Sequence, residues 1–311
     1  MFVDSKERLR RLACLYACAN SLEPLMAYKL DPNMMYMMPT HFGPNYGPRQ
    51  GARGARFILH SLAKQTRYGV SFLTNREQLE DLLPEGFHVG TEPIVSVEAT
   101  MLSEIPWLAG RGYNTLGVRF PAVFRGKNDS ATGTFLAVLW ENLTEPILTG
   151  REELGFSKVY ADISTPRTHG NEIHIFASWM GFKFLELKIA PQVLVGLDKI
   201  PDLIRQTVGD GILHFKYIPR TGGKWEQADA CYATLSPINV SGPNGPSGNQ
   251  NLPEMWLGEG SLQFHQASWE DMPTQFHIVN ALNQLEVKKY LGASVLKTVQ
   301  ATDFKDQRIL Q

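Results

Sequence analysis

One segment of the chain decides how the rest is interpreted: Thr149-Gly150-Arg151-Glu152-Glu153-Leu154-Gly155-Phe156-Ser157-Lys158-Val159-Tyr160-Ala161-Asp162. Its charged first half predicts the end of a helix, a Gly-Phe pair breaks that helix, and Lys158 then enters an apolar strand. An amine held against apolar neighbours loses hydration, which lowers its pKa. A neutral amine can attack a ketone and form a Schiff base. The alternative is an ordinary surface lysine at the start of a strand.

The sequence on both sides of this segment is mostly strand-like. Runs rich in β-branched and aromatic residues predict strands at 68–74, 94–102, 113–124, 134–140, 158–163, 172–178, 182–189, 213–218, 230–240 and 261–266. Helices are expected at 5–29, 76–83 and 145–154, and a long strand or a bent pair at 285–299. Residues 39–56 predict irregular backbone. Many strands and few helices predict an α+β fold that is predominantly β, as a β-barrel or a double sheet.

The quoted segment resembles the acetoacetate decarboxylase family. In that family a Gly-Arg-Glu triplet precedes an imine-forming lysine, which lies in a Gly-aromatic-Pro-Lys-Lys motif. Residues 150–152 match the triplet, and Gly155, Phe156 and Lys158 match the second motif at the family's spacing. The resemblance implies an acetoacetate decarboxylase-like fold and a reactive Lys158.

Other parts of the chain agree with the family in the same order. Residues 97–99 resemble a strand that carries a pocket glutamate, which is Glu98 here, and residues 113–121 resemble the following pocket strand. Residues 180–183 resemble a Met-Gly-aromatic-Lys turn, and residues 282–296 resemble the C-terminal strand. The order of these matches predicts a single domain at 41–311, with a long loop near 241–260, after an N-terminal helical extension at 1–40.

Three positions depart from the family's pattern. Ser157 replaces the motif proline, Val159 replaces its second lysine, and Thr115 stands where the family has a pocket glutamate. Because the neighbouring cation is absent, Lys158 depends on burial for any lowering of its pKa.

The resemblance implies a lyase that decarboxylates a β-keto acid through a Schiff base on Lys158, without a cofactor. Glu98 would orient the substrate or transfer a proton, or would pair with an arginine in the core. The substrate carboxylate would bind Arg49, our first choice, or Arg67, our second. Three further residues, Tyr113, Thr115 and Phe156, would contact the substrate. Two alternatives remain open: a lysine-dependent aldolase, dehydratase or isomerase acting on a larger specialised-metabolism carbonyl compound, or a non-catalytic binding protein of the same fold.

Composition excludes several other classes of protein. Basic and acidic residues number 30 and 31, and this near-neutral balance argues against a nucleic-acid binder. A mean hydropathy of −0.20 without a long apolar run argues against a membrane protein. Residues 4–11 are too charged, and the apolar run after them is too short, for a secretory signal peptide.

No metal, nucleotide or acyl-transfer motif is present in the sequence. The histidines and cysteines do not occur at metal-ligand spacings, and neither a phosphate-binding glycine loop nor a GxSxG motif occurs. Three cysteines (Cys14, Cys18 and Cys231) suit a reducing compartment, so we expect a cytoplasmic protein. The family implies a homo-oligomer, whose interface the Met-rich stretch at 34–38 could extend.

Overall fold

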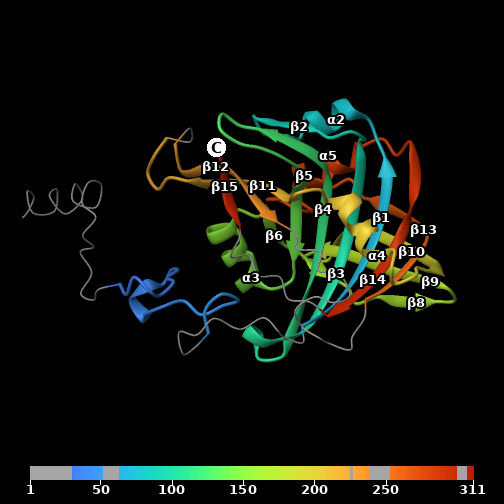
Figure 1. Ribbon diagram of the computed structural model, residues 1–311, viewed down its shortest axis with the longest axis horizontal. Helices are drawn as coiled ribbons and strands as arrows, with labels where there is room; N and C mark the ends of the chain where they lie inside the picture. Colours follow the sequence, from blue (N-terminus) through green and yellow to red (C-terminus); the bar gives the residue numbers. More distant parts are fainter. Residues whose placement is uncertain (1–29, 52–62, 225–226, 238–252, 300–306) are drawn as a thin grey trace, which may run out of the picture. The chain divides into compact units, whose positions relative to one another are not determined.

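A computed structural model describes residues 30–51, 63–224, 227–237, 253–299 and 307–311 (Figure 1). The chain divides into two compact units, Met1–Phe57 and Ile58–Gln311, and each unit is described by itself. The predicted helix at 5–29 and most of the predicted loop near 241–260 lie outside the described residues. The proposed boundary at residue 40 therefore stays a prediction.

The described part of the first unit contains one short helical turn, η1 (Thr40–Phe42), in otherwise irregular backbone. The buried side chain of Gln50 ties this backbone together. Its amide nitrogen donates to the carbonyl oxygens of Met35 (3.0 Å) and Asn45 (2.6 Å), and its oxygen accepts from the Met35 amide (2.8 Å). Hydrogen bonds of this kind satisfy backbone groups that have no helix or strand partner.

The second unit consists mainly of strands. They are β1 (Lys64–Leu73), β2 (Phe87–Val89), β3 (Ile94–Ile105), β4 (Arg111–Arg125), β5 (Ser130–Glu141), β6 (Lys158–Tyr160), β7 (Asp162–Ile163), β8 (Arg167–His169), β9 (Glu172–Trp179), β10 (Phe182–Leu194), β11 (Gly211–Pro219), β12 (Ala228–Pro237), β13 (Glu254–Phe264), β14 (Lys289–Val299) and β15 (Arg308–Leu310). The helical elements are α2 (Arg76–Glu80), η2 (Pro106–Leu108), α3 (Thr144–Thr149), η3 (Gly150–Leu154), α4 (Ile200–Val208) and α5 (Phe276–Asn283).

These strands form one large mixed sheet in the order β15-β12-β11-β5-β4-β3-β1-β14-β13-β10-β9-β7. Figure 1 shows β5, β4, β3, β1 and β14 side by side. The prediction of a mostly β fold is confirmed, but the sheet is not closed into a barrel, so that part of the prediction is wrong. Its order ends at β15 on one side and β7 on the other, since neither strand has a second neighbour among the described strands.

One parallel crossover positions the segment that contains Lys158. Strand β5 runs into α3 and η3, and the chain returns as β6, which pairs parallel with β5. The next strand, β7, pairs with β9 instead. Parallel neighbours need such a crossover, usually a helical one. The single run from β6 to β7 therefore contacts two parts of the sheet that are distant in strand order.

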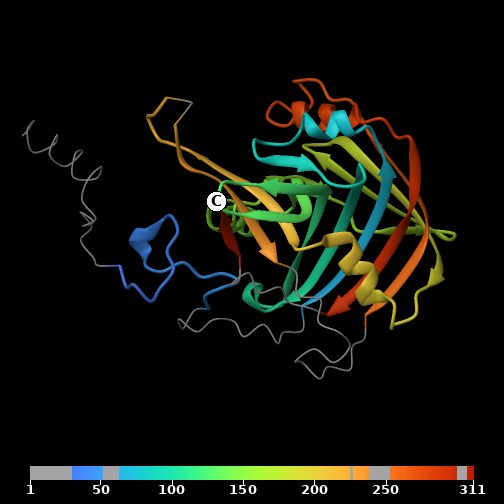
Figure 2. The same ribbon diagram turned by 45° about the horizontal axis from the view of Figure 1, so that its top comes forward.

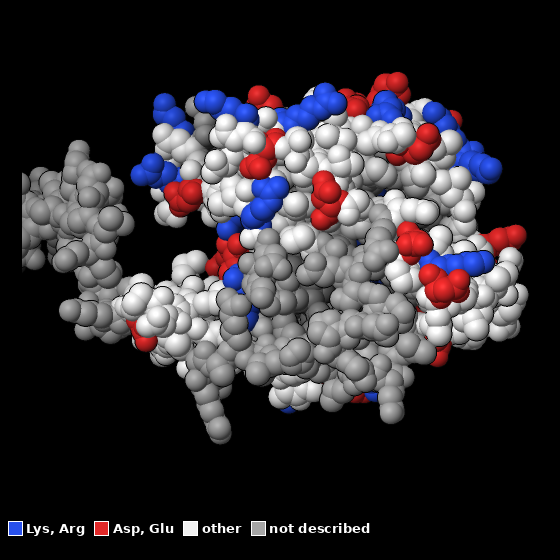
Figure 3. Space-filling model, in the orientation of Figure 1, with Lys and Arg blue, Asp and Glu red and all other residues white. Residues whose placement is uncertain are grey.

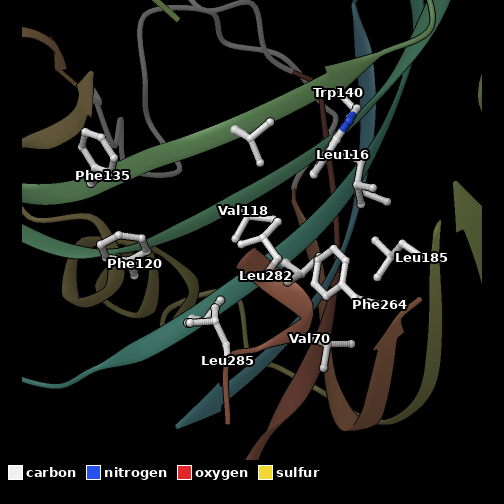
Figure 4. Packing of buried hydrophobic residues seen from close by; sticks show 14 of the residues in the cluster. Val70, Leu116, Val118, Phe120, Phe135, Trp140, Leu185, Phe264, Leu282 and Leu285 are labelled. Carbon is white, nitrogen blue, oxygen red and sulfur yellow. The ribbon is translucent and has the colours of Figure 1, made fainter. Parts of the chain in front are cut away.

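The hydrophobic core lies on one face of the sheet. Alternate side chains along each strand point to this face, such as Val70 on β1, Leu116 and Val118 on β4, and Trp140 on β5 (Figure 4). Side chains of α5 pack against the same cluster, Leu282 among them. Both α2 and α5 lie at the same end of the sheet in Figures 1 and 2.

Two helices and one long strand differ most from the sequence prediction, and the short strands β2, β8 and β15 were not predicted either. The helices α4 and α5 were not predicted, although Val279 and Leu282 are buried one helical turn apart in α5. Strand β13 begins at Glu254, so residues 254–260 are strand rather than the end of a loop. The reason is pairing: β13 has a long register with β10 and a shorter one with β14. Those partners lie far away along the chain and leave no local signal.

Candidate active site

Strand pairing decides where the Lys158 side chain points. On β6, Lys158 lies opposite Leu139 of β5, and Tyr160 lies opposite Glu141. The core residue Trp140 is opposite Val159 and points to the other face. Because side chains alternate along a strand, Lys158 and Glu141 share the face of the sheet that is turned away from the core.

Lys158 and Glu141 form a buried ion pair. The Lys158 Nζ lies 2.9 Å from the Glu141 Oε1, and the two side chains are only 8% and 2% exposed. The same amine donates to the Pro146 carbonyl oxygen at 2.9 Å and lies 5.3 Å from the centre of the Phe156 ring. Lys158 is thus a buried amine in a defined position, not a surface lysine.

Burial shifts the pKa values of both Lys158 and Glu141 so that the neutral form of each side chain is favoured. It lowers the pKa of Lys158 and raises the pKa of Glu141, and in each case the partner's charge partly opposes the shift. Burial, and then the charge of Glu141, raise the pKa of Tyr113. The Glu141 Oε2 is buried and accepts no hydrogen bond from any described residue. Losing hydration favours a neutral amine and a protonated carboxyl over two separated charges.

The helical turn before β6 explains why a glycine and an arginine stand at positions 150 and 151. A Cβ at Gly150 would lie 2.5 Å from the Lys158 Cε and 2.7 Å from its Nζ, so only glycine leaves room for the lysine. The Arg151 Nη1 donates to the Lys158 carbonyl oxygen at 2.8 Å. Both residues lie in η3, a π-helical turn, and such turns are rare and often occur at functional sites.

Other polar residues lie on the same face of the sheet. Cross-strand register aligns Lys158 with Leu139, Gly117 and Glu98 in one row, and aligns Glu141 with Thr115, Thr100 and Arg67 in the next. We call this the polar face, defined by Arg67, Ser71, Ser96, Glu98, Thr100, Tyr113, Thr115, Arg119, Glu141 and Lys158.

Two arginines and one glutamate carry the charge at the other end of the polar face. The Arg119 Nη2 donates to the Glu98 Oε2 at 2.7 Å. Burial lowers the pKa of Arg67, with Glu98 opposing the shift and Arg119 adding to it. Arginine keeps its charge in proteins, so this group has one positive charge in excess.

A buried histidine lies on the other side of Lys158. The His214 ring packs against the Phe156 ring at a centroid distance of 4.0 Å, and its Nε2 lies 3.0 Å from the Ser236 Oγ. Burial, and then the charge of Lys158, lower the pKa of His214 well below its ordinary value. This imidazole is therefore neutral near pH 7.

A cleft of about 260 Å³ opens where β11 separates from β5. The two strands pair only at Ile212 and Leu213 of β11. The residues that line the cleft are Ala137, Val138, Arg151, Gly155, Phe156, Ser157, Val159, Phe215, Lys216, Tyr217, Ile218 and Ile278. Ser157 and Val159, which flank Lys158 in the sequence, line the cleft, but Lys158 is not itself part of the lining.

The structure brings most of the predicted site residues onto one face. Lys158, Glu98, Tyr113, Thr115 and Arg67 belong to the polar face. The sixth, Phe156, packs beside Lys158. The last, Arg49, belongs to the first unit, which is not placed relative to the second, so its assignment stays a prediction.

Sequence reasoning missed Glu141, Arg119 and His214. The predicted strand at 134–140 ended one residue before Glu141. A charged residue directly after an apolar strand was a usable signal. The histidine had none, because its contacts come from residues distant in the chain.

The described residues also bear on the metal-binding, membrane and surface-charge properties of the protein. They contain no group of three or more His, Cys, Asp or Glu side chains able to hold a metal ion. None of the helices that the structure describes is long and apolar enough to cross a bilayer. Basic and acidic side chains are interspersed over the described part of the surface in Figure 3.

The chain is similar to proteins of one family. The family model described as Acetoacetate decarboxylase (ADC) matches residues 37–307. An acetoacetate decarboxylase from Legionella pneumophila subsp. pneumophila str. Philadelphia 1 is 15% identical, with a TM-score of 0.61, covering 92% of this chain and 98% of that chain. A second solved acetoacetate decarboxylase is also 15% identical, with a TM-score of 0.57, covering 80% and 89%.

A third solved relative is the enduracididine biosynthesis enzyme MppR, complexed with pyruvate. It is 14% identical, with a TM-score of 0.52, covering 84% of this chain and 95% of that chain. At these identities the likeness to the solved structures shows a shared fold. No curated protein matches the chain.

Proposed function

Because the chain belongs to the acetoacetate decarboxylase family, we propose that it is a lyase that decarboxylates a β-keto acid through a Schiff base on Lys158. The observation that carries the proposal is the buried Lys158 amine, held 2.9 Å from a carboxylate and pressed against Gly150. Burial lowers the pKa of this amine, and an imine can form only from its neutral form.

The reaction proceeds in three steps. The neutral Lys158 amine attacks the ketone carbon, and loss of water leaves a protonated imine. The bond to the carboxylate carbon then breaks, carbon dioxide leaves, and the bonding electrons move into the imine to give an enamine. Protonation of the enamine carbon and hydrolysis release the ketone product and restore Lys158. The imine nitrogen accepts the electrons, so no bound cofactor is needed in this scheme.

The substrate carboxylate is attracted by the excess positive charge beside Glu98. Arg119 donates to the Glu98 carboxylate, Arg67 lies close enough to feel its charge, and guanidinium groups bind carboxylates well. Neighbouring strands are about 4.8 Å apart, so the Arg119 backbone on β4 is about 10 Å from β6 across the sheet. Glu98 orients Arg119. Thr115 lies on β4 in the row that joins Arg67 to Glu141, Tyr113 lies two residues further along the same strand, and both would contact the substrate.

A second candidate function is another lysine-dependent reaction, such as an aldol condensation, a dehydration or an isomerisation of a larger carbonyl compound. This second function is favoured because the charges on the polar face are placed differently from the pattern that the family resemblance implies. Thr115 stands where the resemblance expects a glutamate, and a carboxylate, Glu141, lies directly across from it on β5. A pocket with its acid in a different place suits a different substrate.

Trapping with borohydride tests the proposed function. The protein is incubated with acetoacetate or pyruvate and reduced, and the modified peptide is identified by mass spectrometry. We expect an adduct on Lys158 that is lost in Lys158→Ala and kept in Lys64→Ala, which removes an exposed lysine of the same sheet. Release of carbon dioxide separates decarboxylation from the second candidate. Full activity of Lys158→Ala on any substrate that the wild type turns over would refute the imine mechanism.

The proposal also covers the cellular location and the oligomeric state of the protein. We place it in the cytoplasm, as a homo-oligomer that acts on small carbonyl compounds. The supporting observations are the few cysteines and the many exposed apolar side chains, Trp269 among them at 62% exposed. Light scattering tests the oligomer, and a monomeric mass would contradict it.

A further inference from the structure

The buried carboxylate of Glu141 contacts the amine that the proposed function makes reactive. Its Oε1 is 2.9 Å from the Lys158 Nζ, and its Oε2 accepts no hydrogen bond from the described residues. A buried carboxylate oxygen without a donor is costly, unless it carries a proton or meets a donor from a ligand. The position of Oε2 therefore needs an explanation that a simple ion pair does not supply.

We propose that Glu141 is a catalytic acid–base that transfers protons to and from the substrate oxygen and the Lys158 nitrogen during imine formation. The proposal rests on the proposed imine chemistry of Lys158 and adds a residue to it. The two oxygens of a carboxylate are separated by about the same distance as the nitrogen and oxygen on a carbinolamine carbon. One glutamate can therefore serve both atoms at once, with Oε1 on the nitrogen and Oε2 on the substrate oxygen.

The protons balance with Glu141 as their only carrier. The reaction begins with a neutral Lys158 and a protonated Glu141. A nitrogen–carbon bond forms, the carbonyl π electrons move to oxygen, and Glu141 protonates that oxygen. The Glu141 carboxylate then removes a proton from the nitrogen and returns it to the hydroxyl. The carbon–oxygen bond breaks, water leaves, and the nitrogen lone pair forms the protonated imine, which leaves Glu141 ionised.

The groups around the pair favour this starting state. Burial raises the pKa of Glu141 and lowers the pKa of Lys158, so the proton shifts toward the carboxyl group. Two further titratable groups lie close enough to feel the charges of the pair: Tyr113 on β4 feels Glu141, and His214 on β11 feels Lys158. Burial keeps both of these neutral near pH 7, so neither supplies a competing charge. Arg151 of η3 contacts the Lys158 backbone rather than its amine.

The position of Glu141 along the chain also suits the role. It is the last residue of β5, directly across from Tyr160 of β6, and the buried Trp140 precedes it. The Trp140 Nε1 donates to the Gln275 Oε1 at 2.7 Å, and the Gln275 amide donates to the Tyr160 carbonyl oxygen at 3.0 Å. These contacts hold the ends of β5 and β6 together, so the carboxylate approaches the amine from a fixed position.

The test is the rate of borohydride trapping on Lys158, measured with pyruvate and with acetoacetate. Glu141→Gln keeps the size and the hydrogen-bond acceptor of the side chain but cannot carry a proton. We expect its trapping rate to fall by about 100-fold or more, the usual effect of losing a general acid–base. Glu145→Gln is the matched control, because Glu145 is an exposed glutamate of the same crossover. We expect this control to trap at the wild-type rate.

The outcomes separate this inference from the proposed function. No adduct in the wild type, with either probe, overturns the imine mechanism itself. A wild-type adduct that forms equally fast in Glu141→Gln overturns only the role of Glu141.

If Glu141→Gln does not fold, as judged by thermal unfolding, Glu141→Asp carries the test. It keeps a carboxyl group that can carry a proton but, being one methylene shorter, moves that group away from the nitrogen. A rate at least tenfold below the wild type supports proton transfer. An unchanged rate shows that the residue only balances charge, which contradicts the proposal.

Discussion

A methyl group added at position 150 tests whether packing holds the reactive amine in place. Gly150 has right-handed helical torsion angles (φ −64°, ψ −40°), where alanine is ordinarily preferred by about 1 kcal/mol. The new Cβ would, however, meet the Lys158 side chain at 2.5–2.7 Å, well inside contact distance. Overpacking of this kind costs about 1–3 kcal/mol, so the net free energy of unfolding falls by about 0–2 kcal/mol.

The effect on chemistry should be much larger than the effect on stability. Relief of the clash requires the Lys158 amine to move by about 1 Å, and displacements of that size cost about 100-fold in rate. We therefore expect Gly150→Ala to unfold a few degrees below the wild type, yet to trap pyruvate about 100 times more slowly. Both are measured on one preparation, by thermal unfolding and by borohydride trapping.

A control separates this effect from the general effect of an added methyl group. A Cβ at Gly47 would meet only the Asn45 side chain, at 4.0 Å, so Gly47→Ala should leave both measurements unchanged. If Gly150→Ala traps at the wild-type rate and is at least as stable, contact with position 150 does not hold the lysine. The reasoning from packing would then be wrong.

Three further predictions follow from the surroundings of the lysine. The wild-type trapping rate should rise with pH and stop rising below pH 10.5, the ordinary pKa of lysine, because burial lowers the pKa of Lys158; a rate still climbing at pH 10.5 would argue against this. His214 has a lowered pKa in the fold, so the unfolded chain binds more protons below pH 6.5 and stability falls there by up to about 1.4 kcal/mol per pH unit. Urea unfolding at pH 7.5 and 5.0 should show a smaller loss in His214→Gln, and equal losses would contradict it. Val159→Lys should destabilise the fold by about 1–3 kcal/mol, because Val159 packs against the core; a wild-type unfolding temperature would show that this position tolerates a charge.

Position 159, the site of the Val159→Lys substitution, also shows which features could be predicted from the sequence alone and which could not. Most strand positions along the chain and the helix-to-strand change before Lys158 were predicted, because both depend on local patterns of apolar residues and on motif spacing. The absence of a second lysine at position 159 was expected to remove a neighbouring cation. Strand alternation shows instead that position 159 points to the opposite face from Lys158.

The partner of the lysine could not be derived from the sequence. Glu141 reaches Lys158 only because β6 returns parallel to β5, and that pairing is a property of the crossover as a whole. The same limit applies to Arg119, which meets Glu98 across two antiparallel strands. Individual residue types indicated candidates, but register decides which of them meet.

The parallel crossover that carries Lys158 also has an evolutionary consequence. Glu141, the lysine and the glycine that makes room for it are encoded in one uninterrupted stretch, Glu141–Lys158, which includes α3 and η3. A recombination event that replaced this stretch would transfer both members of the pair together. The arginines on β1 and β4 would stay behind. Reactivity and substrate preference could then diverge separately, which is one route by which a single fold acquires several carbonyl substrates.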